Sequence, residues 1–360
     1  MVEPAPLRNV PIDPDRLQAF RARFSADQAA AMHLATVLLG DRLGLYGAMA
    51  EGGPLTDTEL ADRTGHHPRL VREWLGAQTV SGYCEYDPGT GRYSLSAEQA
   101  ACLADPTSTT FLASAPLLVA GMYKDTSMLE RAFTQDGSVE WGEHDPDLFI
   151  GVERLFEPIY RGNLVQNWIP ALDGVADKLQ AGARVADVGC GHAASLILLA
   201  KAFPNSSFWG FDYHAGSIET ARKRVTEAGL ADRVNVEVAG AENFPGKDYD
   251  LICVFNALHE WGDPERGARY IREALASDGT CMFIEPNAPD HLEDNQGPVG
   301  RTFYAASTFV CVPSSLSQGS TALGAQAGEA AIRDVATRAG FEHFGRVTET
   351  PQLMVLEARP

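Results

Sequence analysis

A glycine-rich turn between an apolar strand and a helix is the strongest chemical signal in the sequence. Asp187-Val188-Gly189-Cys190-Gly191 closes the apolar run 184–188 and precedes a helical segment that starts at Ala194. Glycine lets the backbone approach a ligand closely, and the first turn of a helix offers free N–H groups. Asp212 closes the next apolar run, where its carboxylate can accept hydrogen bonds from ribose hydroxyls. The pattern predicts a site for a nucleoside cofactor.

Two nucleoside cofactors compete for this site, a dinucleotide and S-adenosylmethionine. Ala194 partly satisfies the dinucleotide fingerprint, because it supplies the small third residue of that pattern. Asp187, two residues before the first glycine, and a late pair of antiparallel strands count against a dinucleotide. The residues expected to bind the cofactor are Asp187, Gly189, Gly191, Asp212, Tyr213, Ala241, Glu242 and Asn256.

His259 is the candidate general base. It lies just beyond the carboxyl end of the expected strand 251–255, where open α/β sheets bind their ligands. A neutral imidazole near a hydroxyl can take its proton, and a phenol, with a pKa of about 10, is easier to activate than an alkyl alcohol. Glu285, at the end of the strand 280–284, can hold the other ring nitrogen if these two strands are neighbours.

Strands and helices alternate from Ala183 onward and must position these residues. The expected strands are 184–188, 207–211, 234–238, 251–255 and 280–284, with helices at 194–202, 217–228 and 264–276. Such alternation predicts a parallel sheet with helices on both faces. The last two strands, 344–348 and 353–358, are expected to form an antiparallel pair.

The first hundred residues predict a winged helix. Helical patterns cover 29–49, 56–65 and 68–80, and short strands at 83–86 and 92–95 flank a turn. Such a module can bind DNA or serve in dimerisation. The candidate recognition helix offers only Arg69 and Arg72 beside Glu73, and the net charge of −19 opposes binding to phosphate backbones. We therefore expect dimerisation or packing against the substrate site, and no nucleic-acid partner.

Residues 107–178 are expected to be helical and rich in aromatic side chains, most of them core. The residues expected to bind the acceptor are Trp141, Phe156, Tyr160, Trp168, Arg301 and Tyr304, with the stretch 309–316 as further lining. The domain boundaries follow as 1–106 for the winged helix, 107–178 for a helical linker and pocket region, and 179–360 for the cofactor-binding domain.

Composition limits the remaining possibilities. The chain has 360 residues, 45% of them hydrophobic and 21% charged, which excludes a disordered chain. Six scattered cysteines without a CxxC motif indicate free thiols in a reducing compartment. The Pro-rich start lacks the apolar segment of a signal peptide, and the apolar runs are too short to cross a membrane. We expect a soluble, cytoplasmic protein without a membrane partner.

Metal ligation is not expected. His259-Glu260 and the pair His66-His67 have no third ligand at the spacing of a known metal motif. His291 could supply one only through the fold.

At this point the chain resembles the class I S-adenosylmethionine-dependent methyltransferases. It is most similar to small-molecule O-methyltransferases of bacteria and plants with an N-terminal winged-helix dimerisation domain. The resemblance extends from about Ala29 to Pro360 and rests on 187–191, Gly210-Phe211-Asp212 and Leu258-His259-Glu260-Trp261-Gly262-Asp263. It implies a homodimer, methyl transfer from S-adenosylmethionine and His259 as the general base. Many relatives have glycine in place of Ala193, where a methyl group could crowd the cofactor.

The expected reaction is O-methylation of a small aromatic hydroxylated metabolite, with His259 as the base and Glu285 as its orienting partner. The acceptor atom could also be nitrogen or carbon. Two other functions stay open: a winged-helix regulator with a small-molecule effector, and a methyltransferase fold with non-methylating chemistry.

Overall fold

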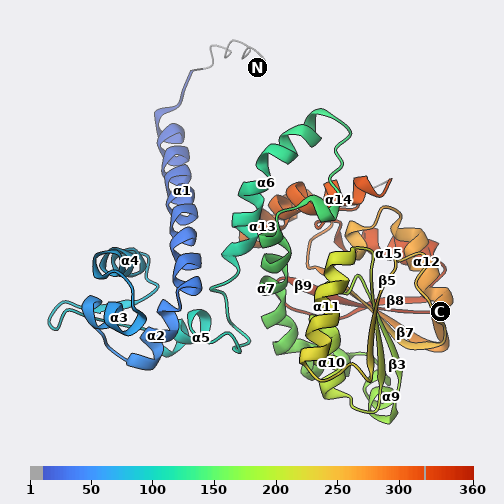
Figure 1. Cartoon of the computed structure of the whole chain (residues 1–360). Coiled ribbons are helices and arrows are strands. Elements are labelled where there is room, and N and C mark those ends of the chain that lie inside the picture. Colours follow the sequence, from blue (N-terminus) through green and yellow to red (C-terminus); the bar gives the residue numbers. More distant parts are fainter. Residues whose placement is uncertain (1–10, 320–321) are drawn as a thin grey trace. The chain divides into compact units, whose positions relative to one another are not determined.

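The computed structural model describes residues 11–319 and 322–360. The chain divides into two compact units, residues 1–116 and 117–360, which are described separately (Figure 1). The Pro-rich start of the chain, expected to carry no signal peptide, lies largely outside the described residues. No helix within the described ranges is both long enough and apolar enough to span a bilayer.

The first unit is a winged helix, as the sequence predicts. Its elements are α1 (Pro14–Arg42), α2 (Leu45–Gly52), α3 (Asp57–Thr64), α4 (Pro68–Val80), β1 (Glu85–Asp87), β2 (Arg92–Ser94) and α5 (Ala97–Leu103). A capping box starts α3: the Thr56 hydroxyl accepts from the Glu59 N–H, and the Glu59 carboxylate accepts from the Thr56 N–H. β1 and β2 pair antiparallel as the wing.

Helix α1 starts fifteen residues before the predicted position of Ala29, at Pro14, where the Asp13 side chain accepts two backbone N–H bonds. The sequence signal is weak there because this part of the helix has no buried apolar face: its large apolar residues, including Phe20 and Phe24, are exposed. The predicted segment 29–49 holds two helices, since Gly44 takes a left-handed conformation, with φ of 67°, between α1 and α2.

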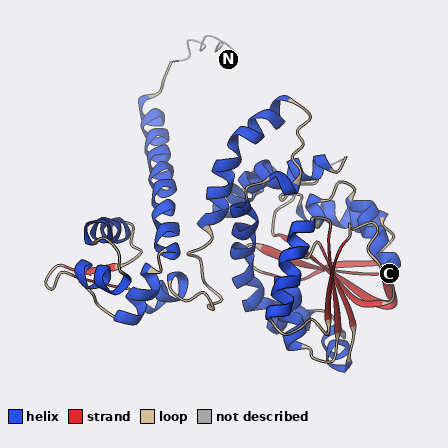
Figure 2. Cartoon of the chain, in the orientation of Figure 1, coloured by secondary structure: helices blue, strands red, loops and turns tan. Residues whose placement is uncertain are grey.

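The second unit is built on a seven-stranded sheet (Figure 2). Its strands are β3 (Arg184–Val188), β4 (Ser207–Asp212), β5 (Val234–Val238), β6 (Tyr249–Phe255), β7 (Leu275–Pro286), β8 (His343–Glu349) and β9 (Leu353–Arg359). The spatial order is β5-β4-β3-β6-β7-β9-β8, and β9 runs antiparallel to both of its neighbours. This is the predicted parallel sheet with a late antiparallel pair.

Helices cover both faces of this sheet. One buried apolar cluster joins the sheet to α9 (Val175–Ala181), α10 (Ala194–Ala202) and α11 (Ala215–Glu227). A second joins the opposite face to α12 (Pro264–Ala274) and α15 (Gly328–Arg338). Because both faces of the sheet are buried, the sequences of the strands are nearly continuous apolar runs.

A further group of helices lies over the carboxyl ends of the strands. It comprises α6 (Pro116–Thr134), α7 (Pro146–Asn163), α8 (Ile169–Ala171), α13 (Pro298–Ala306) and α14 (Val312–Ser317), with π-helical turns at Leu164–Trp168 and Ser307–Cys311. α6 and α7 approach closely at Gly151, where a Cβ atom would lie 2.2 Å from the Leu118 nitrogen. Leu118, Leu148 and Phe303 form the apolar cluster that holds these helices together.

Candidate functional site

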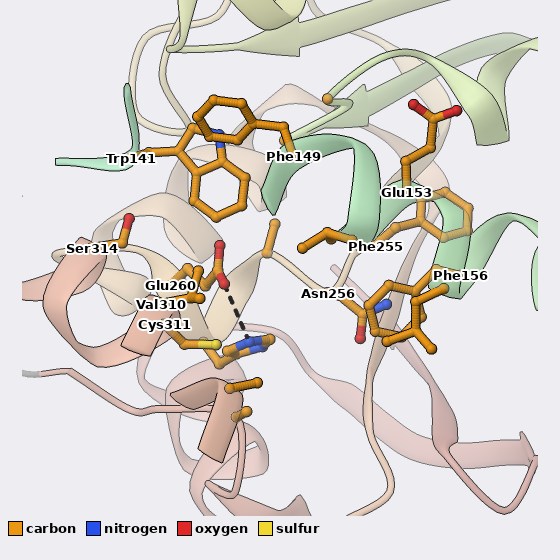
Figure 3. A pocket seen from close by; sticks show the side chains of 18 of the residues that line it. Trp141, Phe149, Glu153, Phe156, Phe255, Asn256, Glu260, Val310, Cys311 and Ser314 are labelled. Carbon is orange, nitrogen blue, oxygen red and sulfur yellow. Dashed lines mark ion pairs between the residues drawn. The ribbon is translucent and has the colours of Figure 1, made fainter. Parts of the chain in front are cut away.

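A cavity lies between the carboxyl ends of the strands and the covering helices (Figure 3). The sheet side contributes Gly189 after β3, Asp212 at the end of β4 and Asn256 after β6. The helix side contributes mainly apolar side chains: Leu118, Trp141, Phe149, Val152, Leu155, Phe156, Tyr160, Phe303, Ala306 and Val310. One wall is therefore polar backbone and carboxylate, and the other is apolar and aromatic.

The glycine turn has the backbone conformation that its sequence predicts. Gly189 and Gly191 have positive φ angles of 81° and 50°, and a Cβ atom on Gly189 would lie 2.7 Å from the Cβ of Ala257. The Gly191 N–H donates to Asp212 Oδ2 at 3.0 Å, and the His214 N–H donates to Asp212 Oδ1 at 2.8 Å. Burial raises the pKa of Asp212.

Two polar side chains near the turn have an acceptor oxygen without a partner. Asp187 is fully buried: its Oδ2 accepts from the Ser195 hydroxyl, and its Oδ1 has no hydrogen-bond partner. Burial raises the pKa of Asp187 to about 7. Asn256 donates from Nδ2 to the Tyr160 hydroxyl at 2.9 Å, while its Oδ1 has no partner. Unpaired buried acceptors are costly, so both oxygens are candidates to accept from the N–H donors of a ligand. Asn256 lines the cavity, whereas Asp187 is absent from the residues that line the cavity and the adjoining pocket.

A smaller pocket adjoins the cavity and shares Gly189, Asp212 and Tyr213 with it. Ala241 and Glu242 line this pocket, as the cofactor prediction requires. The Glu242 carboxylate also pairs with Arg266 of α12, at 2.9 Å, which holds the loop after β5 against the next helix.

The candidate base and its partner lie together. β6 and β7 are neighbouring parallel strands, with Phe255 paired to Ile284, so His259 after β6 comes next to Glu285 of β7. His259 Nδ1 hydrogen-bonds to Glu285 Oε2, and the Leu258 N–H donates to Glu285 Oε1 at 3.1 Å. Because a carboxylate only accepts, Nδ1 carries the proton in the neutral ring and Nε2 keeps its lone pair.

Two opposing effects of the environment act on the pKa of His259. Burial alone would lower its pKa, but the charge and hydrogen bond of Glu285, with the nearby charge of Glu260, raise the pKa above its ordinary value of 6.5. Glu285 is fully buried behind the ring, whereas His259 lines the cavity. The arrangement can accept a proton from a hydroxyl group in the cavity.

Among the predicted acceptor residues, Trp141, Phe156 and Tyr160 line the cavity. The Trp141 ring lies 5.3 Å from that of Phe149, and the Tyr160 ring lies 5.1 Å from that of Phe255. These rings are tilted relative to one another, by 45° and 55°, and form an apolar aromatic wall of the cavity.

Three predicted acceptor residues do not reach the cavity. Trp168 is 1% exposed and packs behind Tyr160, with the ring centres 6.0 Å apart, so it is core. Arg301 is exposed on α13, and Tyr304 lines a separate groove beside Phe133 of α6. The face of α13 that meets the cavity carries Thr302, Phe303 and Ala306 instead.

Ala193 lies outside the lining of the cavity, so the structure does not support the expectation that its methyl group crowds the cofactor. It adopts a left-handed conformation with φ of 63° as the N-cap of α10, and its side chain is fully buried in the apolar cluster beneath the helix. It is absent from the residues that line the cavity and the adjoining pocket.

Several lining residues were assigned no role from the sequence. Phe255 and Phe303 gave only a general apolar signal, whereas Glu260 directly follows the candidate base and could have been noticed for that reason. Val310, Cys311 and Ser314, within the predicted lining stretch 309–316, all reach the cavity.

Comparisons with known proteins agree with this fold. Residues 179–330 match the model of a methyltransferase domain, and residues 30–105 match that of an Rv2258c-like winged HTH domain. Aklanonic acid methyltransferase DauC of Streptomyces sp. strain C5 is 40% identical over 108 residues, which are 29% of this chain and 49% of that protein. The chain spans about a quarter to a half of the length of the first curated relatives it matches.

Solved structures cover nearly the whole chain. Human N-acetylserotonin methyltransferase in complex with SAM has a TM-score of 0.70 and 17% identity, covering 95% of this chain and 97% of that one. The mitomycin 7-O-methyltransferase MmcR has a TM-score of 0.68 and 20% identity, covering 97% and 100%. Likeness at this identity establishes the fold.

The two matched domains and the fold describe the chain. It carries a methyltransferase domain and an N-terminal winged HTH domain, and its second unit has a Rossmann-like methyltransferase fold. Among the similar structures, the human enzyme is in complex with SAM, and PigF and CalO1 are in complex with SAH.

Proposed function

We propose that the protein methylates a hydroxyl group of a small aromatic molecule, with His259 as the general base and Glu285 as its positioning residue. The observation that carries the proposal is the buried Glu285–His259 pair, whose ring lines a cavity with aromatic walls. The matched proteins include an aklanonic acid methyltransferase and a mitomycin 7-O-methyltransferase, which supports a small organic acceptor.

The residues around the glycine turn fit S-adenosylmethionine. When bound, the cofactor supplies an electrophilic methyl group on a sulfonium centre. Gly189 and Gly191 allow close backbone approach, and Asp212 can accept from ribose hydroxyls. The unpaired oxygens of Asp187 and Asn256 can accept from the amino-acid ammonium group. The acidic side chains also complement the positive charge of this cofactor.

His259 supplies what O-methylation requires of the chain. A hydroxyl oxygen must lose its proton as it attacks a methyl carbon, and Nε2 of the neutral ring is free to accept that proton. Glu285 fixes the tautomer and stabilises the imidazolium that forms. Phe149, Phe156 and Phe303 exclude water and orient a planar acceptor, so that proximity supplies part of the rate.

Dimerisation is the proposed role of the winged helix, rather than DNA binding. Of the basic residues on and beside its recognition helix, Arg69 pairs with Glu73, Arg72 pairs with Asp57, and Arg92 of the wing pairs with Glu59. These carboxylates offset the charge that phosphate contacts need. A regulator is thus disfavoured, and a gel-shift assay at low salt is expected to show no complex with duplex DNA.

The test begins with calorimetric titration of S-adenosylmethionine, with NAD as the comparison. We expect binding of the former alone. Screening of phenols is then expected to find methyl transfer that His259→Ala lowers by about 10²–10⁴-fold, with cofactor affinity retained. His291→Ala, on an exposed loop, is the matched control. Undiminished activity of His259→Ala would contradict the proposed base, and transfer only to amines would contradict the acceptor class.

A further inference from the structure

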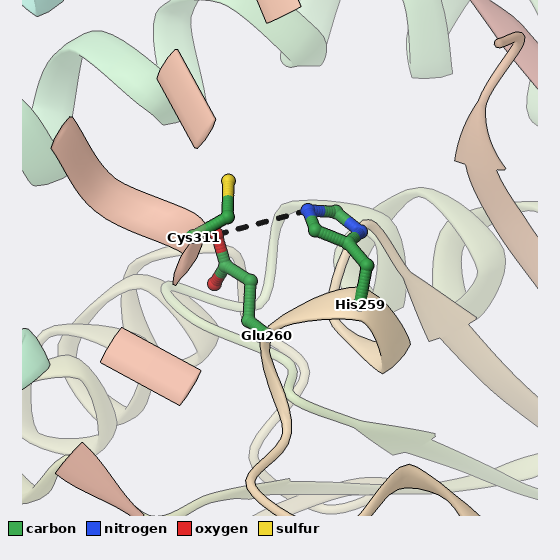
Figure 4. A group of neighbouring side chains, drawn as sticks. All are labelled: His259, Glu260 and Cys311. Carbon is green, nitrogen blue, oxygen red and sulfur yellow. Dashed lines mark ion pairs between the residues drawn. The ribbon is translucent and has the colours of Figure 1, made fainter. Parts of the chain in front are cut away.

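Three side chains with metal-ligating atoms converge on one side of the cavity (Figure 4). They are His259 and Glu260, on the turn after β6, and Cys311, at the end of the π-helical turn Ser307–Cys311. One ligand atom from each of the three residues lies within 4.8 Å of the other two. Sequence spacing predicts no third ligand for His259-Glu260, because only the fold brings Cys311 there, and His291 is an exposed residue outside this group.

The three side chains leave a position open for a ligand. His259 is buried, its Nδ1 is taken by Glu285, and its Nε2 lies 3.8 Å from Glu260 Oε1. All three side chains line the cavity, so a fourth position is open to a water molecule or a ligand. In the neutral ring, Nε2 therefore presents its lone pair toward this group.

The geometry approaches that of a tetrahedral site. Zinc bonds of about 2.0–2.3 Å to nitrogen, oxygen and sulfur place neighbouring ligand atoms about 3.3–3.8 Å apart. The nitrogen–oxygen separation of 3.8 Å exceeds the roughly 3.4 Å of a zinc-bound nitrogen–oxygen pair by about 0.4 Å, and the other separations exceed the tetrahedral values by at most about 1.5 Å. A π-helical turn is a common device for bringing one side chain into a site, and here it presents Cys311.

We propose that His259, Glu260 and Cys311 form a binding site for Zn²⁺ within the acceptor cavity. The nitrogen, carboxylate and thiolate donors suit this borderline-soft cation, and three protein ligands leave one coordination position open. The metal ion replaces the thiol proton of Cys311, which is released to solvent on binding.

The site has a functional consequence that rests on the proposed function. Zn²⁺ binds the same Nε2 lone pair that accepts the proton of the acceptor, so an occupied site cannot contain an active base. The ion also occupies part of the acceptor cavity. Zn²⁺ is therefore an inhibitor that competes with the acceptor and leaves S-adenosylmethionine binding intact.

The first experiment measures metal binding by the full chain, without any acceptor. Protein stripped with a chelator is titrated with Zn²⁺ by calorimetry, and with Co²⁺ by absorption. We expect one Zn²⁺ per chain and a thiolate-to-cobalt charge-transfer band. Cys311→Ser and Glu260→Gln are each expected to weaken Zn²⁺ binding by at least about tenfold, with the cobalt band lost in Cys311→Ser.

Cys102→Ser, at a half-buried cysteine of the winged helix, is the matched control and is expected to bind as wild type. Thermal melts verify that each variant folds. If Cys311→Ser does not fold, Glu260→Gln alone tests the site. Absence of stoichiometric Zn²⁺ binding, or binding that Cys311→Ser and Glu260→Gln retain in full, would overturn the site.

Zn²⁺ binding and methyl transfer are measured separately. Competitive inhibition by Zn²⁺ that a chelator reverses, and that Cys311→Ser weakens, supports the inhibitory role. A chain that binds Zn²⁺ but methylates no hydroxyl supports the site and contradicts the proposed function. A chain that methylates a phenol but binds no Zn²⁺ supports the proposed function and contradicts the Zn²⁺ site.

Discussion

Glu285 of β7 hydrogen-bonds to Nδ1 of His259, which follows the neighbouring strand β6, and holds the imidazole between a buried carboxylate and an open cavity. The Leu258 N–H donates to the second oxygen of Glu285, so the carboxylate is held at both ends. This arrangement fixes which ring nitrogen is protonated, and it also sets the pH range in which the ring can act as a base.

Replacing Glu285 by Gln is expected to change both the rate and its pH dependence. A base works only when unprotonated, so wild-type activity rises with pH through a midpoint above 6.5, the ordinary pKa of histidine. Without the Glu285 charge, burial dominates and lowers the pKa of His259, which moves the midpoint to lower pH. We expect kcat to fall by roughly 10²–10³-fold, because the tautomer is no longer fixed. Rate profiles from pH 5 to 9 measure both effects.

The shift in the pH profile separates a positioning role from a structural one. Glu285→Asp, which keeps the charge, is expected to keep the midpoint above 6.5 at a reduced rate. An unchanged midpoint in Glu285→Gln, with normal folding, would contradict the assigned role.

Replacing Asp187 by Asn is expected to stabilise the cofactor-free protein and to weaken cofactor binding. The pKa of Asp187 is about 7 in the fold against 3.8 in the unfolded chain. Between these values the native state holds a proton that the unfolded state has lost, so stability decreases as pH rises from about 4 to about 7. Neutral Asn removes this cost, and we expect a gain on the order of 1–3 kcal/mol in unfolding free energy at pH 8.

Thermal melts at pH 5 and pH 8 measure the stability change, which is expected to be much smaller at pH 5 than at pH 8. Calorimetry is expected to show at least about tenfold weaker binding of S-adenosylmethionine, because a charged acceptor for its ammonium group is lost. Equal affinity in the variant would show that Oδ1 of Asp187 does not contact the cofactor.

Replacing Ala193 by Gly is expected to leave cofactor affinity unchanged, within about twofold, because this side chain lies in the core. Relief of the left-handed strain, about 1–2 kcal/mol, is offset by loss of a buried methyl group and by a more flexible unfolded chain. Calorimetry and urea unfolding measure the two quantities. A tenfold gain in affinity would mean that the methyl group does obstruct the cofactor.

The sequence predicts most of the second unit because local signals there agree. Apolar runs of strand length alternate with helical patterns from Ala183 onward, and the glycine turn falls between β3 and α10 as expected. The pair formed by His259 and Glu285 follows from the same logic, since β6 and β7 are adjacent in the sheet.

What the sequence did not predict depends on packing between distant helices. Periodicity shows that Arg301, Phe303 and Tyr304 lie on one helix, but not which face meets the cavity. The π-helical turn after α13 shifts the direction of the following side chains by an extra residue per turn, and this brings Cys311 beside Glu260. The position of Trp168 also depends on packing, because its ring lies behind that of Tyr160, and the spacing of residues in the sequence does not predict this contact.

The neighbours Phe303 and Tyr304 offer a direct test of which face of α13 binds the acceptor. Phe303 is 7% exposed and lines the cavity, whereas Tyr304 is 38% exposed and lines the separate groove beside α6. Phe303→Leu is expected to raise KM for the acceptor by about 3–10-fold through lost aromatic contact, with KM for S-adenosylmethionine unchanged. Tyr304→Leu, the matched control, is expected to change neither constant. Steady-state kinetics with both substrates varied measure this difference, and an acceptor KM that responds to Tyr304→Leu but not to Phe303→Leu would reverse the orientation of the helix in the binding site.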